Sequence, residues 1–231
     1  MLQVIYEDNH LIAVNKPAGI LVQGDETGDA SLDNMVKHFI KVRYNKPGDV
    51  YLATLHRIDR PTSGVVVFAR TSKAAERMSK LFQTGGIEKT YLAITNNRPD
   101  PLAGRLEHYL VKNSENNTVK AYSSNKKGGK LAVLEYEFMG QMDKSHQLIK
   151  VNLHTGRSHH IRVQLAKIGS IIHGDLKYGA EHPNLDMSIS LHCRSMSFVH
   201  PVTQEKVIIK ADLPKNPIWK DISELLLQEN L

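Results

Sequence analysis

The chain has 231 residues, of which 41% are hydrophobic, and its formal net charge is +6. This length can bury a substantial core as one large domain or two small ones. The single cysteine, Cys193, excludes an internal disulfide and a cysteine zinc site, and it fits a reducing compartment. Because the sequence shows no secretion-signal pattern and its apolar stretches are only strand-sized, we expect a cytoplasmic protein without a membrane span.

The first part of the chain has the pattern of short strands and two helices. Two apolar runs within residues 2–14 flank the polar turn 7–10 and predict a pair of strands. Ser31 is expected to cap a helix, because apolar residues then recur at helical spacing, namely Leu32, Met35, Val36, Phe39 and Ile40. A strand at 65–68 precedes a second helix, which Thr71 or Ser72 would cap and Gly85-Gly86 would end.

Strand-like runs dominate the second half of the chain. They lie at residues 89–95, 105–112, 130–138 and 147–154, and the polar connector 113–129 has room for a short strand at 119–122. A third helix is expected at 158–168, capped by Ser158 and ended by Gly169. The whole pattern predicts an α+β fold, with a mixed, mainly antiparallel sheet flanked by a few helices and loops.

The run Leu55-His56-Arg57-Ile58-Asp59-Arg60-Pro61-Thr62-Ser63-Gly64 sets one carboxylate between two cations. Nearby positive charge favours the ionised form of Asp59, which suits a nucleophile or a base. The run therefore predicts a catalytic loop. The plainer alternative is an Asp that forms ion pairs within its own loop before a strand.

Basic residues gather near the same part of the sequence. Seven Lys or Arg residues stand against three acidic ones between His56 and Tyr91, and six stand against two between Asp143 and Lys177. This distribution favours a partner that carries phosphate groups, although a solvated basic face would have the same composition.

Several ordered motifs together resemble the RluA-type pseudouridine synthases over almost the whole chain. They are the Asp59 loop, Glu88-Lys89-Thr90-Tyr91-Leu92-Ala93-Ile94, residues 153–165, Val14-Asn15-Lys16-Pro17-Ala18-Gly19 and Ile172-His173-Gly174-Asp175. The pieces 191–192, 198–201 and 211–214 look like the last strands of that family's catalytic domain. The resemblance implies a single catalytic domain over residues 1–231, without a separate N-terminal RNA-binding domain.

By this resemblance the chain isomerises specific uridines in rRNA or tRNA to pseudouridine. Asp59 would be the essential carboxylate, Arg162 the cation that pairs with it, and Tyr91 the ring that stacks on the target uracil. The carboxylate could attack the sugar or the base, or remove the C2′ proton of the ribose, and the sequence leaves these routes open. The alternative function is a non-catalytic RNA-binding or assembly protein on the same fold.

The other residues assigned to the site would hold RNA. In related enzymes the arginine two residues before the catalytic Asp fills the space left by the flipped nucleotide, and here that residue is Arg57. The remaining candidates for RNA contacts are His56, Arg60, Lys89, Arg157 and His159.

The sequence departs from the family pattern in one place, because His160 and Gln164 exchange the usual positions of Gln and His. Adjacent His159 and His160 on a helix would point about 100° apart, so a shared metal ion is not expected. No cofactor is called for, and we expect a monomer whose partner is RNA.

Overall fold

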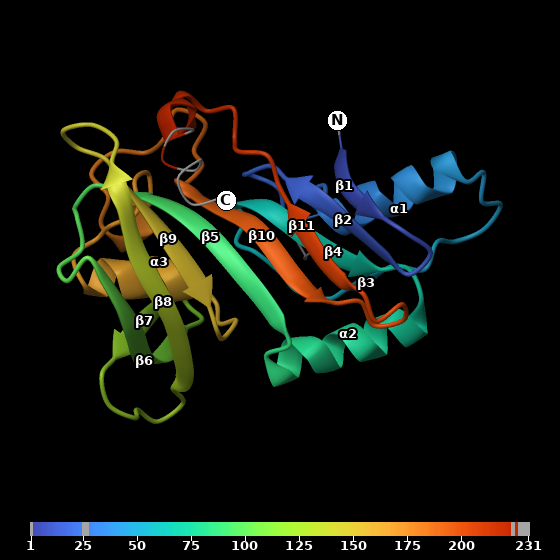
Figure 1. Ribbon diagram of the computed structural model, residues 1–231, viewed down its shortest axis with the longest axis horizontal. Coiled ribbons are helices and arrows are strands. Elements are labelled where there is room, and N and C mark those ends of the chain that lie inside the picture. The colour runs from blue at the N-terminus through green and yellow to red at the C-terminus, as the bar shows by residue number, and fades with distance from the viewer. Residues whose placement is uncertain (1, 25–27, 223–224, 226–231) are drawn as a thin grey trace. The chain divides into compact units, whose positions relative to one another are not determined.

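The computed structural model describes residues 2–24, 28–222 and 225 (Figure 1). The chain divides into two compact units. The first unit comprises Met1–Glu88 and Cys193–Asp212, and the second comprises Lys89–His192 and Leu213–Leu231. The single catalytic domain predicted over residues 1–231 stays a prediction.

Antiparallel strands and two helices build the first unit (Figure 1). Strands β1 (Gln3–Glu7), β2 (Leu11–Lys16) and β4 (Ser63–Ala69) pair in that order, and the short β3 (Ala53–Thr54) also pairs with β4. Strand β10 (Leu191–Val199), which enters this unit at Cys193, pairs with β11 (Lys206–Lys210). The helices are α1 (Leu32–Arg43) and α2 (Ser72–Thr84). All of β4 is buried, so the strand that follows the Asp59 loop lies in the core.

The second unit contains a sheet in the order β5, β9, β8, β6, β7, with each neighbouring pair antiparallel (Figure 1). The strands are β5 (Ile87–Thr95), which enters this unit at Lys89, β6 (Ala103–Asn113), β7 (Thr118–Tyr122), β8 (Lys130–Gln141) and β9 (Gln147–Leu153). Helix α3 (His160–Lys167) and the 3-10 turns Leu176–Tyr178 and Pro217–Ile222 complete it. One core cluster joins Leu92, Ile94 and Leu148 to Trp219 and Ile222.

The predicted α+β class and the mainly antiparallel sheet are confirmed. The second helix begins and ends as expected, because the Thr71 hydroxyl accepts a hydrogen bond from the Ala74 amide (3.2 Å) and Gly85 takes a left-handed conformation. Ser31 is the N-cap residue of α1 as predicted, but its hydroxyl makes no capping hydrogen bond and is bonded instead to the carboxylate of Asp33.

Helix α3 starts at His160 rather than at the predicted Ser158. His159 has a φ of 52°, and this left-handed residue cannot continue a right-handed helix. Strand β3 was not predicted, and β11 ends at Lys210, before the piece 211–214 that was expected to be a strand. Strand β3 has only two residues and β11 only five, so each gives a weak pattern in the sequence.

Gly64 fixes the entry of the chain into β4. Its φ is +115°, and a Cβ at this position would lie 2.2 Å from the carbonyl oxygen of Cys193. No side chain fits there, because backbone cannot move aside as a flexible side chain can. The close approach explains why the predicted catalytic loop ends in glycine.

Among the described residues, no helix is both long enough and apolar enough to cross a lipid bilayer.

Candidate active site

The Asp59 loop lies between β3 and β4 and is tied to the turn that follows β2. The Gly19 amide donates to the Arg60 carbonyl (2.8 Å), and the Arg60 Nε donates to the Gly19 carbonyl (2.9 Å). Within the loop the Thr62 amide donates to the Asp59 carbonyl (3.0 Å). Arg60 also forms an ion pair with Asp29 at 3.0 Å. The backbone around Asp59 is thus held from both sides, as a positioned carboxylate requires.

Lys16 is the central support of this loop, although it lies at the end of an apolar strand and is completely buried. Its ammonium donates to the carbonyls of Pro17 (2.9 Å), Ile20 (2.8 Å) and Arg60 (3.1 Å). Burial lowers the pKa of Lys16 to about 7, while the charge of Asp59 opposes this shift and that of Arg60 adds to it. Lys16 therefore joins the loop both by hydrogen bonds and by its electrostatic interaction with Asp59.

The side chains next to Asp59 divide between core and solvent. Ile58 is buried and anchors the loop, whereas Arg57 and Arg60 are exposed. The His56 Nε2 accepts a hydrogen bond from the Val67 amide (3.0 Å), and its ring stacks on Phe82 with centroids 5.1 Å apart. These contacts give His56 a structural role in the loop, and its predicted RNA contact stays a prediction.

In the second unit, Arg162 forms a bidentate ion pair with Asp175. Its Nε and Nη2 donate to the two carboxylate oxygens, each at 2.7 Å, and the side chains are 5% and 1% exposed. The guanidinium carbon also lies 5.1 Å from the centre of the Tyr178 ring. Such a bidentate pair fixes the plane of the guanidinium as well as its charge.

Tyr91 is placed by the register of β5, where it lies directly opposite Val151 of β9. Its side chain is only 6% exposed. Lys89, two residues earlier on the same strand, is half-buried. Because side chains two residues apart on a strand point to the same face, the two candidates share one face of β5.

The histidines near the start of α3 are buried, and Arg157 is not. The His159 Nδ1 is hydrogen-bonded to the Tyr178 hydroxyl (2.7 Å), and the His160 Nδ1 donates to the Thr155 carbonyl (2.8 Å). Burial lowers the pKa of His160 to about 4, although the bond to Thr155 raises it. The exposed Arg157 donates from Nε to the Leu131 carbonyl (3.0 Å).

The structure thus places His56, Arg57, Asp59 and Arg60 in the first unit, and Lys89, Tyr91, Arg157, His159 and Arg162 in the second. The pairing of Arg162 with Asp59 stays a prediction. Sequence reasoning missed the support that Lys16 and Asp175 provide, even though both stand in the motifs quoted for the family resemblance.

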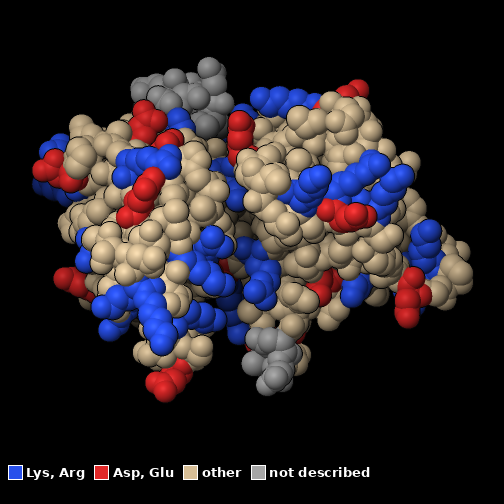
Figure 2. All heavy atoms as spheres, turned by 90° about the horizontal axis from the view of Figure 1, so that it is seen from below, with Lys and Arg blue, Asp and Glu red and all other residues tan. Residues whose placement is uncertain are grey.

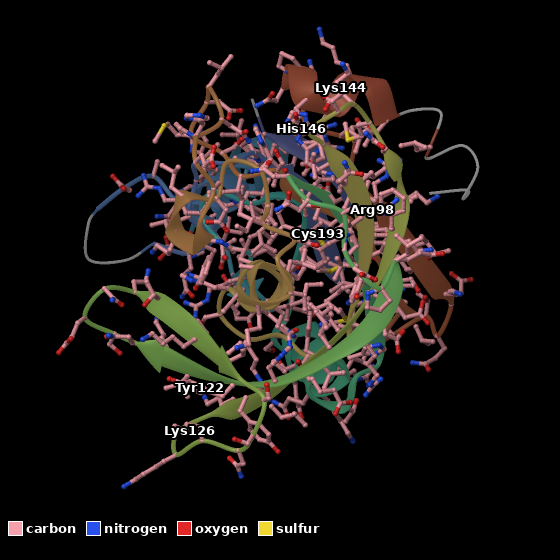
Figure 3. All side chains as sticks on the ribbon, turned by 90° about the vertical axis from the view of Figure 1, so that its left-hand side faces the viewer. Arg98, Tyr122, Lys126, Lys144, His146 and Cys193 are labelled. Atoms are coloured by element: carbon pink, nitrogen blue, oxygen red, sulfur yellow. The ribbon has the colours of Figure 1, made fainter. Side chains whose placement is uncertain are left out.

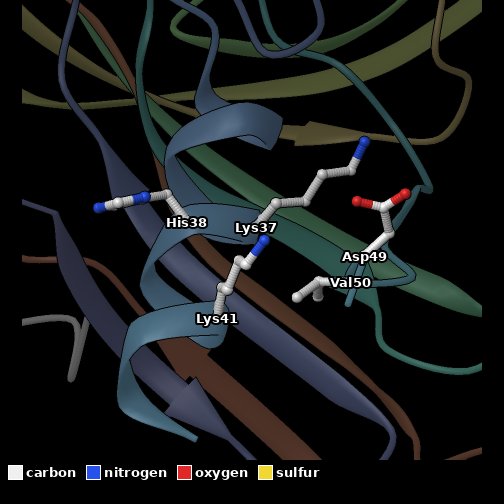
Figure 4. Close-up of a pocket in the computed structure, with 5 residues that line it drawn as sticks. All are labelled: Lys37, His38, Lys41, Asp49 and Val50. Atoms are coloured by element: carbon white, nitrogen blue, oxygen red, sulfur yellow. The ribbon is translucent and has the colours of Figure 1, made fainter. Parts of the chain in front are cut away.

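Two cavities lie apart from these residues. One, of about 400 Å³, is lined by Lys37, His38 and Lys41 of α1 with Asp49 and Val50 (Figure 4). Another, of about 410 Å³ in the second unit, includes His146, which is hydrogen-bonded to Asp143 (2.7 Å) and to His173 (3.3 Å). Within the described ranges, no group of three or more His, Cys, Asp or Glu side chains is arranged to hold a metal ion.

Comparison with known proteins gives a consistent result. The family model described as RNA pseudouridylate synthase matches residues 10–167. The chain is 31% identical over 246 residues to a tRNA pseudouridine synthase C of Haemophilus influenzae, and the match covers 100% of both chains. It is 32% identical over 225 residues to a ribosomal large subunit pseudouridine synthase D of Zymomonas mobilis, covering 93% of this chain and 70% of that protein.

A solved structure supports the same fold. The structure titled human RNA pseudouridylate synthase domain containing 4 superposes with a TM-score of 0.77 at 21% identity, covering 99% of this chain and 93% of the other. At this identity the likeness concerns the fold.

Proposed function

This chain belongs to the RluA-type RNA pseudouridine synthases and is therefore an isomerase, and from that premise we propose that Asp59 is its catalytic carboxylate and that its substrates are specific uridines of tRNA or rRNA. Relatives named for each kind of RNA support the substrate class. These substrates fit the predicted cytoplasmic location.

The proposed reaction leaves the atomic composition of the nucleotide unchanged. The bond from uracil N1 to ribose C1′ breaks, the base turns, and a bond from C5 to C1′ forms. The proton on C5 is lost to solvent, and N1 gains one. An ionised carboxylate can promote this exchange by attacking the sugar or the base, or by removing the C2′ proton.

The observation that carries the proposal is the way the Asp59 loop is held. The backbone beside Asp59 is fixed through the Arg60 carbonyl, which accepts from the Gly19 amide (2.8 Å) and the Lys16 ammonium (3.1 Å). A carboxylate on a loop of this rigidity acts from one position, which a near-attack geometry demands. The exposed Arg57 and Arg60 beside it supply positive charge for the RNA backbone.

Arg162 and Tyr91 complete the proposed machinery. A guanidinium has five N–H donors, and Asp175 uses two of those on Arg162. The ion pair fixes the plane of this guanidinium, and we assign to Arg162 the role of orienting the carboxylate of Asp59. Tyr91, which the pairing of β5 with β9 holds in place, would stack on the uracil through its ring.

Arg57 would take the place of the extruded nucleotide. It is exposed, and the residue after it, Ile58, is buried, so its backbone is anchored while its side chain can reach outward. Extrusion of a stacked base costs a few kcal/mol, and a side chain that fills the vacated space offsets part of that cost.

The test is tritium release from tRNA and rRNA labelled at uracil C5 and taken from cells that lack this gene. We expect release by the wild type and none by Asp59→Asn, with RNA affinity retained within about twofold, because binding would rest mainly on phosphate contacts. Asp49→Asn, an exposed carboxylate of the same unit, is the matched control and should stay active.

Full activity of Asp59→Asn would overturn the role of Asp59. Salt-sensitive RNA binding without release from either RNA by the wild type would overturn the proposed substrates and favour the non-catalytic RNA-binding alternative.

A further inference from the structure

One face of the sheet edge formed by β6, β7 and β8 is covered by helix α3. Leu110, Val119 and Ala132 from the three strands pack against Val163 of the helix. Because side chains alternate along a strand, the neighbours of these residues point to the opposite face.

That opposite face carries two tyrosines. Tyr109 of β6 lies directly across from Tyr122 of β7, and Leu131 of β8 lies across from Tyr109 on its other side. Val111 and Lys120 form the next pair on the same face of the sheet. Directly opposed residues have their Cβ atoms about 5 Å apart, so the two tyrosine side chains leave the sheet from adjacent positions. Both tyrosines are half-buried, and Leu131 is 43% exposed.

A turn borders the face next to the tyrosines. The Gly129 amide donates to the Lys126 carbonyl (2.7 Å), and Gly128 between them has a φ of +78°. A Cβ on Gly129 would lie 3.1 Å from the Cβ of Tyr109, so this turn lies against the base of that side chain. The platform is therefore built on paired strands and a tight turn rather than on a loose loop.

Basic residues lie in the segment next to the two tyrosines. Residues 118–130 contain four lysines and no acidic residue. The Lys126 ammonium lies 5.5 Å from the centre of the Tyr122 ring, and the two residues neighbour each other in Figure 3. Arg157 joins them, because it is bonded to the carbonyl of Leu131 (3.0 Å). Figure 2 shows that Lys and Arg side chains gather in groups on the face drawn there, with Asp or Glu side chains beside several of them.

We propose that Tyr109 and Tyr122 form a second contact with RNA, a platform on which bases of a single-stranded segment stack while Lys120, Lys126 and Arg157 bind the adjoining phosphates. Flat rings on a sheet surface bordered by cations suit nucleobases, which present a π-face and a phosphate at regular spacing. An apolar partner would need a wider apolar surface, and lysines interrupt the apolar surface around these two tyrosines. The inference rests on the proposed function, because RNA is the partner.

Photocrosslinking tests the position of the bases. The probe is a single-stranded RNA of twelve nucleotides with 5-iodouridine at each position in turn, bound to full-length Asp59→Asn so that no turnover occurs. We expect adducts on the peptides that contain Tyr109 and Tyr122. Adducts at Tyr91 alone would overturn the platform and leave the proposed function standing, whereas salt-independent binding without adducts at any of the three tyrosines would count against both.

Affinity measurements test the stacking itself. Tyr122→Ala should weaken binding of the same RNA, without iodine, about tenfold, whereas Tyr122→Phe should stay within about twofold because the ring is kept. Tyr51→Ala removes an exposed tyrosine of the other unit and should leave affinity unchanged. Lys126→Gln should reduce the slope of log affinity against log salt by about 0.7. Equal affinities for Tyr122→Ala and the wild type, with thermal midpoints also equal, would overturn the platform.

Discussion

The ammonium of Lys16 donates a hydrogen bond of 3.1 Å to the carbonyl of Arg60, and this contact joins the end of β2 to the loop that carries Asp59. A completely buried lysine is costly, because its charge loses hydration. Here three carbonyl oxygens replace part of that hydration, and Asp59 favours the charged form. The fold therefore accepts the cost of burial at the position where the proposed catalytic loop must be held.

Lys16→Met should destabilise the protein and lower isomerase activity together. The variant removes the donor that three backbone carbonyls share, which we expect to reduce the free energy of unfolding by about 1 to 3 kcal/mol. Urea denaturation measures the stability and tritium release the activity. Lys46→Met changes an exposed lysine of the same unit and should alter neither. A Lys16→Met protein as stable and active as the wild type would refute the supporting role.

Alternation and helical spacing predicted most of the elements correctly. Residues 89–95 and 147–154 were expected to be strands, and they became β5 and β9, because short, largely apolar runs suit a strand that is buried in a sheet. The cap at Thr71 was predicted for the same local reason, since its hydroxyl reaches an amide only three residues away. Such signals lie within one element.

The contacts that hold the candidate site are of another kind. Asp175 lies 13 residues after Arg162 in the sequence, beyond the end of helix α3. No periodic pattern of residues links the two positions. Lys16 belongs to one of the family motifs, but a lysine normally lies at the surface, so its burial does not follow from the sequence. The left-handed backbone of His159, which moved the start of α3, likewise depends on tertiary contacts such as the bond to Tyr178.

The free energy of unfolding should decrease as pH falls below 6.5, because His160 is buried in its neutral form. Burial lowers its folded-state pKa to about 4, below the ordinary value of 6.5. Between these values the unfolded chain binds a proton that the folded protein does not, so the contribution of His160 is complete above pH 6.5 and is lost as pH falls toward 4. The loss amounts to about 3 kcal/mol at most.

His160→Gln should remove this part of the acid sensitivity, since a glutamine amide can still donate to the Thr155 carbonyl. Urea denaturation at a series of pH values between 4 and 7 measures the difference. His38→Gln, a change at an exposed histidine, is the control and should follow the wild type. The same pH dependence in His160→Gln and wild type would contradict the assignment.

Asp175→Asn should be strongly destabilising. The substitution removes the carboxylate from a buried guanidinium, and breaking a buried ion pair by one partner costs about 3 to 5 kcal/mol. Thermal and urea unfolding measure the loss, with Asp100→Asn, at an exposed carboxylate of the same unit, as the control. A change below about 1 kcal/mol would show that the pair contributes little, and the proposed orientation of Arg162 would lose its basis.

Arg57→Ala separates base extrusion from the chemical step. If Arg57 fills the space of the flipped nucleotide, its loss should lower kcat/KM about tenfold or more on a uridine within a folded RNA stem, where unstacking must be compensated. On an unstructured RNA of the same sequence the loss should stay within about threefold, because no stacked base has to leave a helix. Lys73→Ala, at an exposed basic residue of α2, controls for the general loss of positive charge and should affect both RNAs equally. Equal losses on the two RNAs for Arg57→Ala would assign this residue to phosphate binding and rule out a role in flipping.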